Sequence, residues 1–572
     1  MGLGSIRKLF RQRSSRQALY LRLLRGLNLD GGYQEWIDGW ERYAPAESRP
    51  PSPVPLTFMV MGELSAADHG YWSGMDAAEL TCQVIFTAAQ APPGNMAAKM
   101  AGVMAMALRE ASAEHVVFLH AADRLAEIAP HRLQAALAAL PEADLIYGDE
   151  DQIDGDGRRF APWFKPDFGE DLFLGQNGFG RAVLFRKSAL QRIEAPDATD
   201  LDTAIYHMAL RVITASGRDP LHCPGILLHV GGDPAATPKA RVLYLKDPAR
   251  RAAVEEFARR RPSLANVQIE GPDAFGFLRL RHPIPTPPPL VSIVIPTRDR
   301  QDLLEQCIRS LDEANRYRNF EIIIVDNDSK EPATKAYFAA LGERGDVRIV
   351  AAPGPFNYSR LINLGAAAAR GELLMALNND IEAIEPDWLD ELVGQALRPE
   401  VGLVGCLLLY PDRSVQHAGV IIGLGGVAGH IFAKTKPRDP GYAARIVVAQ
   451  DLNAVTGACH IMRRDVFDRL GGLDEKHLAV AYNDIDFCLR VREAGLRVIY
   501  TPFAPLLHRH SASRGSDVRP ERLAGFTWER DYMRTRWASR IWDDPFFNPN
   551  LSLSGKKGRL ATPPRQRLYK GR

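Results

Sequence analysis

The sequence predicts an α/β protein built from two related domains in which strands alternate with helices. The chain has 572 residues, more than one hydrophobic core usually holds. A proline-rich stretch, 281–289 (RHPIPTPPP), divides it. After this stretch, apolar runs of strand length alternate with segments of helical periodicity, and a weaker version of the same order precedes it.

The composition is that of an ordinary globular protein, with 46% hydrophobic and 24% charged residues. The net charge of +2 gives no support for a nucleic-acid-binding surface. Six scattered cysteines form no Cys-x-x-Cys pair, which argues against a disulfide framework or a cysteine zinc site. We therefore expect most cysteines to be small core residues of a cytoplasmic protein, in a reducing compartment.

The two ends of the chain are basic. Residues 1–50 begin with a segment that carries seven Arg and Lys residues before Asp30, the first acid, and that has a possible apolar side. Such a helix could lie on an anionic membrane at the inner face of the cytoplasmic membrane, or it could pack on its own protein. No apolar run is long enough to span a bilayer. Residues 546–572 are interpreted as a basic tail, disordered over its last part.

The stretch at 281–289 is interpreted as a linker, because prolines so closely spaced fit neither a helix nor a central strand. It separates a first half, 51–284, from a second half, 285–545. In the second half, strands are expected at LVSIVIP (290–296), FEIIIVDNDS (320–329), ELLMAL (372–377) and LRVIYTP (496–502), with helices at QDLLEQCIRSL (301–311), SRLINLGAAAARG (359–371) and IDFCLRVREAG (485–495).

Three strands of the second half end in polar residues, at Pro296–Asp299, Asp326–Asp328 and Asn378–Asp380. If the strands are parallel, these ends meet at one edge of the sheet, where an α/β protein binds a nucleotide. Asp326 could accept hydrogen bonds from a base or ribose, and Asp380 could bind a divalent cation that bridges to phosphate. The alternative is that each polar residue only caps a helix.

A later segment adds more candidate groups. Asn483 and Asp484 stand at the start of the helix expected at 485–495, with Asp486 in its first turn, and helix capping alone could explain one of these acids. His508 and His510 follow the strand at 496–502. A histidine with a carboxylate makes a plausible manganese or magnesium site, although a lone histidine is more often structural.

The first half shows the same order less clearly. PLTFMVMG (55–62) could be its first strand, and EHVVFLHAADRL (114–125) takes the place of GELLMALNNDIE (371–382). ADLIYGDEDQIDGDGRR (143–159) follows as a strand and an acidic, turn-rich loop.

Taken in order, the segments VSIVIPTRDR, IIIVDNDS, ARGELLMALNND, GGLDE, NDIDFCLRVREAG and HRHSASRG resemble family-2 glycosyltransferases of the GT-A fold, over about 285–530. The stretch 147–177 is similar to the leading domain of bacterial two-domain members, which include rhamnosyltransferase-like enzymes of O-antigen and polysaccharide synthesis. The resemblance implies two tandem GT-A-like domains, Rossmann-like nucleotide-diphospho-sugar transferase folds, with the first one degenerate.

The resemblance also implies an inverting reaction that moves a sugar from a UDP- or dTDP-sugar to a hydroxyl of a surface glycan or lipid-linked acceptor, with Mn²⁺ or Mg²⁺ as cofactor. By this resemblance Asp484 is the catalytic base, and Asn483 stands where many members have an acid. Asp380 is the main metal ligand, because the first carboxylate of the family's metal motif is the amide of Asn378 here. His508 completes the metal site, with His510 as the competing choice.

Other residues match positions that bind the nucleotide or border the sugar. The donor pocket takes in Pro296, Thr297, Asp299, Asp326, Asn378 and Asn379. Arg360 and Asn363 position the diphosphate or pack beneath it, and Thr456–Ala458 border the sugar or acceptor. The glycine-rich segment 423–429 is interpreted as a mobile loop over the acceptor side in preference to a phosphate loop.

The first half is expected to be catalytically silent and to serve docking or acceptor positioning, because it carries His120, Ala121 and Ala122, with Asp123, where related domains carry acids. A second activity with a changed metal site is the alternative. For the whole chain, the alternative to an enzyme is a nucleotide-sugar-binding or scaffold protein of a polysaccharide assembly complex, which a large distance between Asp484 and Asp380 would favour. A nucleotidyltransferase is disfavoured, because no Gly-rich, Lys-bearing triphosphate loop lies near the first strand of the second half.

Overall fold

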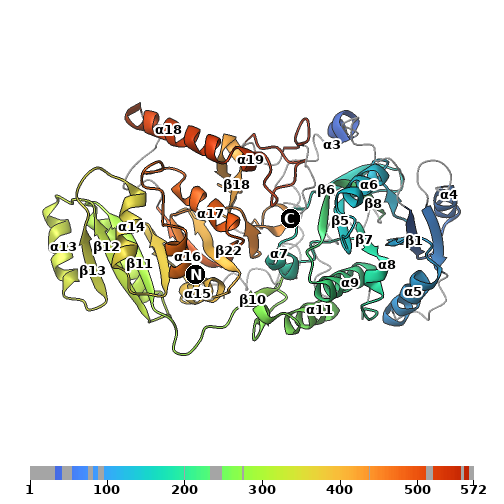
Figure 1. Cartoon of the computed structure of the whole chain (residues 1–572), viewed down its shortest axis with the longest axis horizontal. Helices are drawn as coiled ribbons and strands as arrows, with labels where there is room; N and C mark the ends of the chain where they lie inside the picture. The colour runs from blue at the N-terminus through green and yellow to red at the C-terminus, as the bar shows by residue number, and fades with distance from the viewer. Residues whose placement is uncertain are drawn as a thin grey trace.

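The structure is a computed structural model in which the two halves of the chain lie side by side along the long axis (Figure 1). It describes residues 33–41, 55–74, 82–87, 96–196, 198, 200–231, 248–273, 276–436, 439–509, 520–554 and 559–565. The basic segment before residue 33 and His510 lie outside these residues.

The first half is built on an eight-stranded sheet with the order β2-β1-β3-β7-β5-β8-β4, in which β6 pairs with β5. Its strands are β1 (Leu56–Met61), β2 (Cys82–Thr87), β3 (His115–His120), β4 (Arg124–Leu125), β5 (Leu145–Ile153), β6 (Arg159–Trp163), β7 (Val183–Arg186) and β8 (Leu221–Gly231). All six residues of β1 are buried, as expected for an apolar run covered on both faces. The helices include α5 (Met96–Glu110), α6 (Ala129–Ala139), α7 (Glu170–Gly175), α8 (Lys187–Leu190), α9 (Leu201–Ser216) and α11 (Pro248–Arg259).

The second half is built on a ten-stranded sheet with the order β13-β12-β11-β14-β21-β16-β22-β15, in which β17 pairs with β16 and β20 with β22. Its strands are β11 (Val291–Thr297), β12 (Phe320–Asp326), β13 (Val347–Ala351), β14 (Leu373–Leu377), β15 (Ile381–Ala383), β16 (Val401–Leu409), β17 (Val415–His417), β20 (Gln450–Leu452), β21 (Cys459–Arg463) and β22 (Arg497–His508). Its helices include α12 (Gln301–Glu313), α13 (Pro332–Gly342), α14 (Tyr358–Ala368), α15 (Trp388–Ala396), α16 (Arg464–Arg469) and α17 (Asn483–Glu493).

The strands predicted in the second half are confirmed. The expected parallel arrangement holds for the three strands whose polar ends the sequence analysis singled out. β12, β11 and β14 run parallel, so their carboxyl ends lie at one edge. Beyond β14 the sheet is mixed, because β21 pairs antiparallel with β14. The mixed part brings β15 and the end of β22 to the same region as the end of β14.

The two sheets have the same strand order when their strands are matched in chain order. The matched pairs are β1 with β11, β2 with β12, β3 with β14, β4 with β15, β5 with β16, β6 with β17, β7 with β21 and β8 with β22. Each pair of neighbours also has the same parallel or antiparallel sense in both sheets. The second half adds β13 and β20 to this common plan.

The two halves are joined by buried ion pairs at α7. Asp171 accepts hydrogen bonds from Arg398 at 2.7 Å and from Arg497, and Arg497 also binds Asp451. Val448 lies so close to Gly175 that a β-carbon there would stand 2.4 Å from it. The residues after the proline-rich stretch therefore do not form a separate body, and the first half packs against the second.

The described part of the C-terminal segment 546–572 packs against the rest of the protein, whereas the sequence predicts a basic tail. After α18 (Pro520–Arg536) and α19 (Ala538–Ile541), the chain returns between the halves (Figure 1). Asn548, which is buried, donates to Asp149 of the first half at 2.8 Å. Ala561, also buried, accepts from the indole of Trp36 near the start of the chain. Asn548 lies before the last part of the chain, for which the sequence predicts disorder, in a stretch (545–554) without basic residues; Ala561 lies within that last part and packs as well.

All six cysteines are buried, as expected for small core residues. Within the described ranges, every helix is too short or too polar to cross a membrane.

Candidate active site

The ends of β11 and β14 are tied together by side chains that the sequence singled out. The amide of Asn379 donates to the hydroxyl of Thr297 at 2.9 Å, and both residues are buried. Pro296 lies inside β11 opposite Val325 of β12. These contacts hold the polar ends of the central strands at one edge of the sheet.

Two acids shape the loop that follows β12. Asp326 accepts from the backbone and the hydroxyl of Ser329, at 2.9 and 2.6 Å. Asp299, in the left-handed region with φ of 51°, accepts from the backbone N–H of Lys330 and Glu331. Both carboxylates therefore brace residues 329–331 beside the ends of β11 and β12, and each has a local structural role besides the one expected for it.

Arg360 and Asn363, the two candidate residues on α14, have different surroundings. Asn363 uses its amide on both sides of Leu473, donating to its carbonyl and accepting from its N–H at 2.9 Å each. These contacts support the packing role for Asn363. Arg360 donates to the carbonyl of Pro353 at 3.0 Å and stays at the surface.

Asp380 meets His508 at the end of β22. Ile381, the first residue of β15, pairs with His508, so that Asp380 stands directly beside the histidine. The Asp380 Oδ1 atom lies 3.1 Å from His508 Nε2, and both side chains are buried. Two groups placed at 380 and 508 in the sequence thus face one another across β15 and β22.

His508 is fixed by a residue that the sequence analysis missed. Gln416, on β17, has its Oε1 atom 2.7 Å from His508 Nδ1. When this carbonyl oxygen accepts the Nδ1 proton, the Nε2 atom carries its lone pair toward the carboxylate of Asp380. A lone pair and a carboxylate oxygen that face each other at 3.1 Å are well suited to share a cation.

The two histidines left without a role in the sequence analysis lie next to this pair. His417 Nδ1 is 3.0 Å from Nδ1 of His430. Burial holds the pKa of His417 well below its ordinary value, with His430 and His508 lowering it further. His417 is therefore neutral at pH 7 and adds no positive charge beside His508.

The glycine-rich segment is packed, in contrast to the mobile loop that the sequence predicts. Its ends form β18 (Val420–Ile422) and β19 (Ala428–His430), which pair with each other. Gly423 has φ of 86°, and a β-carbon there would lie 2.0 Å from the carbonyl of Ile541. The glycines allow a tight turn against the C-terminal segment, which sequence patterns cannot reveal.

Asp484 lies in the first turn of α17, where it touches a loop before β21. Its Oδ2 atom accepts from the N–H of Gly457 at 2.7 Å and its Oδ1 from Ile485 at 2.8 Å. Burial raises the pKa of Asp484, while these backbone donors lower it in part. The carboxylate is thus held by backbone groups, and among the residues that the structure describes no basic side chain forms an ion pair with it.

A short chain of contacts links Asp484 to the end of β14. The hydroxyl of Tyr358 donates to the carbonyl of Gly457 at 2.8 Å and reaches Asn378 at 3.4 Å. The N–H of Asn378 donates to the carbonyl of Ala458. Burial, with the charges of Asp484 and Asp380, raises the pKa of Tyr358. The loop 456–458 therefore brings the Asp484 carboxylate and the Asn378–Asp380 turn into one site.

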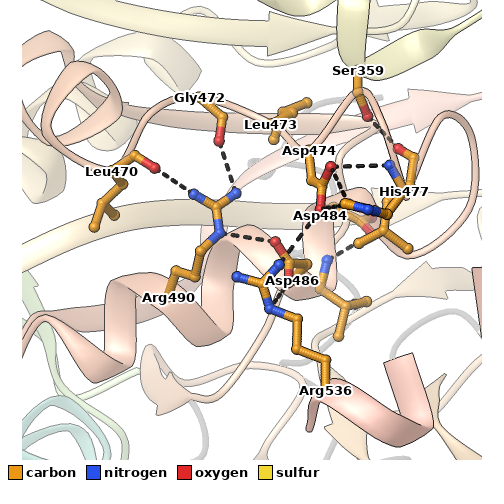
Figure 2. Close-up of polar contacts among 12 residues, drawn as sticks. Ser359, Leu470, Gly472, Leu473, Asp474, His477, Asp484, Asp486, Arg490 and Arg536 are labelled. Carbon is orange, nitrogen blue, oxygen red and sulfur yellow. Dashed lines mark hydrogen bonds and ion pairs between the residues drawn. The ribbon is translucent and has the colours of Figure 1, made fainter. Parts of the chain in front are cut away.

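The neighbouring acid Asp486 is used by the fold (Figure 2). It is buried and accepts from Arg490 at 2.8 Å and from the indole of Trp537 at 2.9 Å. Arg490 also donates to the carbonyls of Leu470 and Gly472 (Figure 2). Of the two acids at the start of α17, Asp486 anchors the helix, and Asp484 points at the loop of the site.

The described residues contain no cluster of three or more His, Cys, Asp or Glu side chains suited to a metal. Asp380 and His508 supply two candidate ligands. Mg²⁺ and Mn²⁺ commonly take only one or two protein ligands when substrate phosphates supply others. The pair therefore fits a cation that binds together with a diphosphate.

The second half matches a known family. Residues 292–471 match the sequence profile described as "Glycosyl transferase family 2". An "Uncharacterized protein y4gI" of Sinorhizobium fredii is 41% identical over 430 residues, which cover 74% of this chain and 47% of that protein. The "O-antigen biosynthesis protein RfbC" of Myxococcus xanthus is 37% identical over 450 residues, covering 77% of this chain and 34% of that protein.

A further relative is the "N-acetylglucosaminyl-diphospho-decaprenol L-rhamnosyltransferase" of Mycobacterium tuberculosis, 27% identical over 237 residues, which cover 37% of this chain and 74% of that protein. A solved structure of "GalNAc-T7 with UDP, GalNAc and Mn2+" has a TM-score of 0.35 and 15% identity, over 44% of this chain and 51% of that chain. That score supports no conclusion here. The chain spans less than half the length of the first two relatives. It carries a glycosyl transferase family 2 domain over residues 292–471, in the half that holds Asp380.

Proposed function

We propose that the second half transfers a sugar, with inversion, from a nucleotide-sugar donor to a hydroxyl of a growing surface glycan or lipid-linked acceptor. The observation that carries this proposal is that Asp484 and the Asp380–His508 pair meet in one site through the loop 456–458. The family 2 domain and the relatives named for O-antigen biosynthesis and rhamnosyl transfer support the same reaction class.

In the proposed reaction, Asp484 takes the proton from the acceptor hydroxyl as its oxygen attacks the anomeric carbon of the donor sugar. The bond from that carbon to the nucleoside diphosphate breaks, and the diphosphate leaves with the bonding electrons. A raised pKa makes Asp484 a stronger base than an ordinary aspartate. Attack opposite to the leaving group inverts the anomeric carbon, so the enzyme needs no covalent nucleophile.

Asp380 and His508 would hold Mn²⁺ or Mg²⁺ beside the diphosphate. The chemistry that the cation supplies when bound is stabilisation of the negative charge that develops on the leaving group. Gln416 orients His508 for this role. The donor nucleotide, UDP or dTDP, would lie along the ends of β11 and β12, beside Thr297, Asp299 and Asp326, with Asn378 and Asn379 at the end of β14 and Arg360 near the rim.

Both halves would have the GT-A fold, with the first half degenerate; their common strand order supports this part of the proposal. The six cysteines, all buried and without a Cys-x-x-Cys pair, fit a cytoplasmic location. Contact of the basic N-terminal segment with the membrane stays a prediction, testable by flotation of intact and end-deleted protein with anionic vesicles.

The test follows nucleoside diphosphate release from a panel of UDP- and dTDP-sugars with glycan acceptors, in Mn²⁺, Mg²⁺ or chelator. Turnover of one donor that is lost in chelator and in Asp484→Asn is the expected result. Donor binding with no turnover of any donor would instead favour a nucleotide-sugar-binding or scaffold protein. Turnover that survives Asp484→Asn would contradict the assignment of the base.

A further inference from the structure

The first half contains acids at the same places in the fold as Asp380 and Asp484. Asp123 directly precedes β4, as Asp380 directly precedes β15. The residue after Asp123 pairs with His229 on β8, and the residue after Asp380 pairs with His508 on β22. A carboxylate and a histidine therefore have the same topological positions in both sheets. Their contacts differ, because His229 Nδ1 lies 2.6 Å from Asp151, whereas His508 faces Asp380.

The first half also has an acid at the position that corresponds to the proposed base, Asp484. Asp202 is the second residue of α9, and Asp484 is the second residue of α17. Each helix follows a matched strand and a short helix, β7 and α8 in the first half and β21 and α16 in the second. Asp202 thus corresponds in position to Asp484.

One difference between the two places lies in the loop before β7 and β21. The loop before β7 contains Arg181, six residues before the start of α8, and the loop before β21 contains Ala458, six residues before the start of α16. The flanking sequences, FGRAVLFRK at 179–187 and TGACHIMRR at 456–464, align at this spacing without a gap. The first half therefore has a long cationic side chain where the second half has a methyl group.

Arg181 bridges the two acids. Its Nη1 atom donates to Oδ1 of Asp123 at 2.9 Å. Its Nε and Nη2 atoms donate to the two oxygens of Asp202 at 2.7 and 3.1 Å. Asp123 is fully buried and the Arg181 side chain is 14% exposed. Burial alone would lower the pKa of Arg181, but the charges of Asp123 and Asp202 outweigh it and hold that pKa well above its ordinary value. This is a paired, charge-assisted contact with little water around it.

The acidic run 149–151 does not offer another cation site, because its carboxylates bind the fold. Asp149 accepts from Gly225 and Asn548. Asp151 accepts from Arg159 and from Tyr33. Glu150 accepts from the backbone N–H groups of residues 181 and 182, and so positions the arginine loop.

We propose that the first half carries a second copy of the sugar-nucleotide site, in which the guanidinium of Arg181 fills the space between the acids that correspond to Asp380 and Asp484. It thereby takes the place beside Asp123 that the divalent cation would take beside Asp380. The proposal rests on the function proposed for the second half. It means that the first half takes no metal and no diphosphate as long as Arg181 joins Asp123 to Asp202. Without the arginine, two carboxylates in a largely dry place would need a counter-cation, and a divalent metal ion is the ligand that they would take.

The test measures Mn²⁺ binding to the full chain from the loss of the free Mn²⁺ signal in electron paramagnetic resonance, with MnCl₂ and UDP or dTDP, relative to the same solution without protein. Asp380→Asn removes the site of the second half. In that background, Arg181→Ala, which copies Ala458, is expected to restore one bound Mn²⁺, and Arg181→Lys, which keeps the positive charge, is not. Adding Asp123→Asn to the Arg181→Ala protein should abolish the restored binding.

The reciprocal change keeps the proposal testable if Arg181→Ala fails to fold. Ala458→Arg should place a guanidinium between Asp380 and Asp484 and reduce Mn²⁺ binding at least tenfold, whereas the uncharged Ala458→Met should reduce it less. Equal Mn²⁺ affinities of the folded Arg and Met variants would overturn the proposal. So would a folded Arg181→Ala, Asp380→Asn protein that binds no Mn²⁺ when the wild type does. If instead the wild type and Asp380→Asn bind Mn²⁺ equally, the function proposed for the second half fails.

Discussion

The two halves of the chain share a plan of strands but differ at the position of Arg181. In the first half, Arg181 joins the acid before β4 to the acid at the start of α9. In the second half, Ala458 stands in that place, Asp380 faces His508, and Asp484 is held by backbone N–H groups. The comparison teaches that a sheet and its pairing can persist while a single side chain decides whether there is room for a ligand.

The halves also differ in how their acids are used. The carboxylates of the first half accept from arginines, histidines and amides that belong to the fold. In the second half, Asp380 and Asp484 have few such partners, and other acids, such as Asp486 and Asp451, bind the side chains that hold the fold together. Folded proteins stabilise most of their buried carboxylates by hydrogen bonds and ion pairs with other side chains. Asp380 and Asp484, which have few such partners, therefore mark the candidate site.

Among the variants that test this difference between the halves, Asp484→Asn should have the largest effect, and that effect is on turnover. Asp484→Asn should lower kcat by about 10²- to 10⁴-fold, because the acceptor loses its general base. Donor affinity should stay within about threefold. Asp465→Asn, which changes an exposed acid at the start of α16, is the matched control and should leave kcat unchanged. A kcat loss that is the same in both variants would contradict the role of Asp484.

In the first half, the change that corresponds to Asp484→Asn is Asp202→Asn, and it should affect the stability of the folded protein. Asp202→Asn removes a carboxylate from Arg181 and should lower the free energy of unfolding by on the order of 3 kcal/mol, measured by denaturant titration. Asp484→Asn should lower it less, because the partners of Asp484 among the described residues are backbone N–H groups and burial, which raises its pKa, disfavours its charge. Equal losses of unfolding free energy in the two variants would mean that Asp202 and Asp484 stabilise the fold to the same extent, which would contradict the difference described between the halves.

A smaller effect is expected at Gln416. Gln416→Leu should weaken Mn²⁺ binding by about 10- to 100-fold, because His508 loses the acceptor that fixes its ring. Gln416→Glu, which keeps an acceptor oxygen, should restore most of the affinity. The nitrogen chemical shifts of His508 should report the Nδ1-protonated form in the wild type and a mixture in Gln416→Leu. An unchanged tautomer in Gln416→Leu would show that Gln416 does not position the histidine.

The smallest effect is on the pH profile. Asp484 must be ionised to act, so kcat should fall as the pH is lowered through its pKa, which burial raises above that of an ordinary aspartate. The profile is measured at saturating donor and at two Mn²⁺ concentrations. An acid limb that moves with Mn²⁺ concentration would report metal loss and would contradict this assignment.

The sequence predicted those parts of the molecule that depend on local pattern. The apolar runs of β11, β12 and β14 located the strands, and the polar residues after them located Asp326, Asn379 and Asp380. Gln416, Tyr358 and Arg181 were missed, because their importance comes from contacts 20 to 99 residues away, such as Gln416 with His508. The linker was predicted, but not the Asp171 ion pairs that join the halves, since these pair residues 227 or more positions apart.

The most direct test of the account is the number of Mn²⁺ ions that one chain binds in the presence of a nucleoside diphosphate, with UDP and dTDP tried separately. The account predicts one ion per chain, lost in Asp380→Asn, because Asp380 and His508 are proposed to hold the cation and Arg181 to fill the corresponding place of the first half. Two ions per chain, or one ion that survives Asp380→Asn, would contradict it.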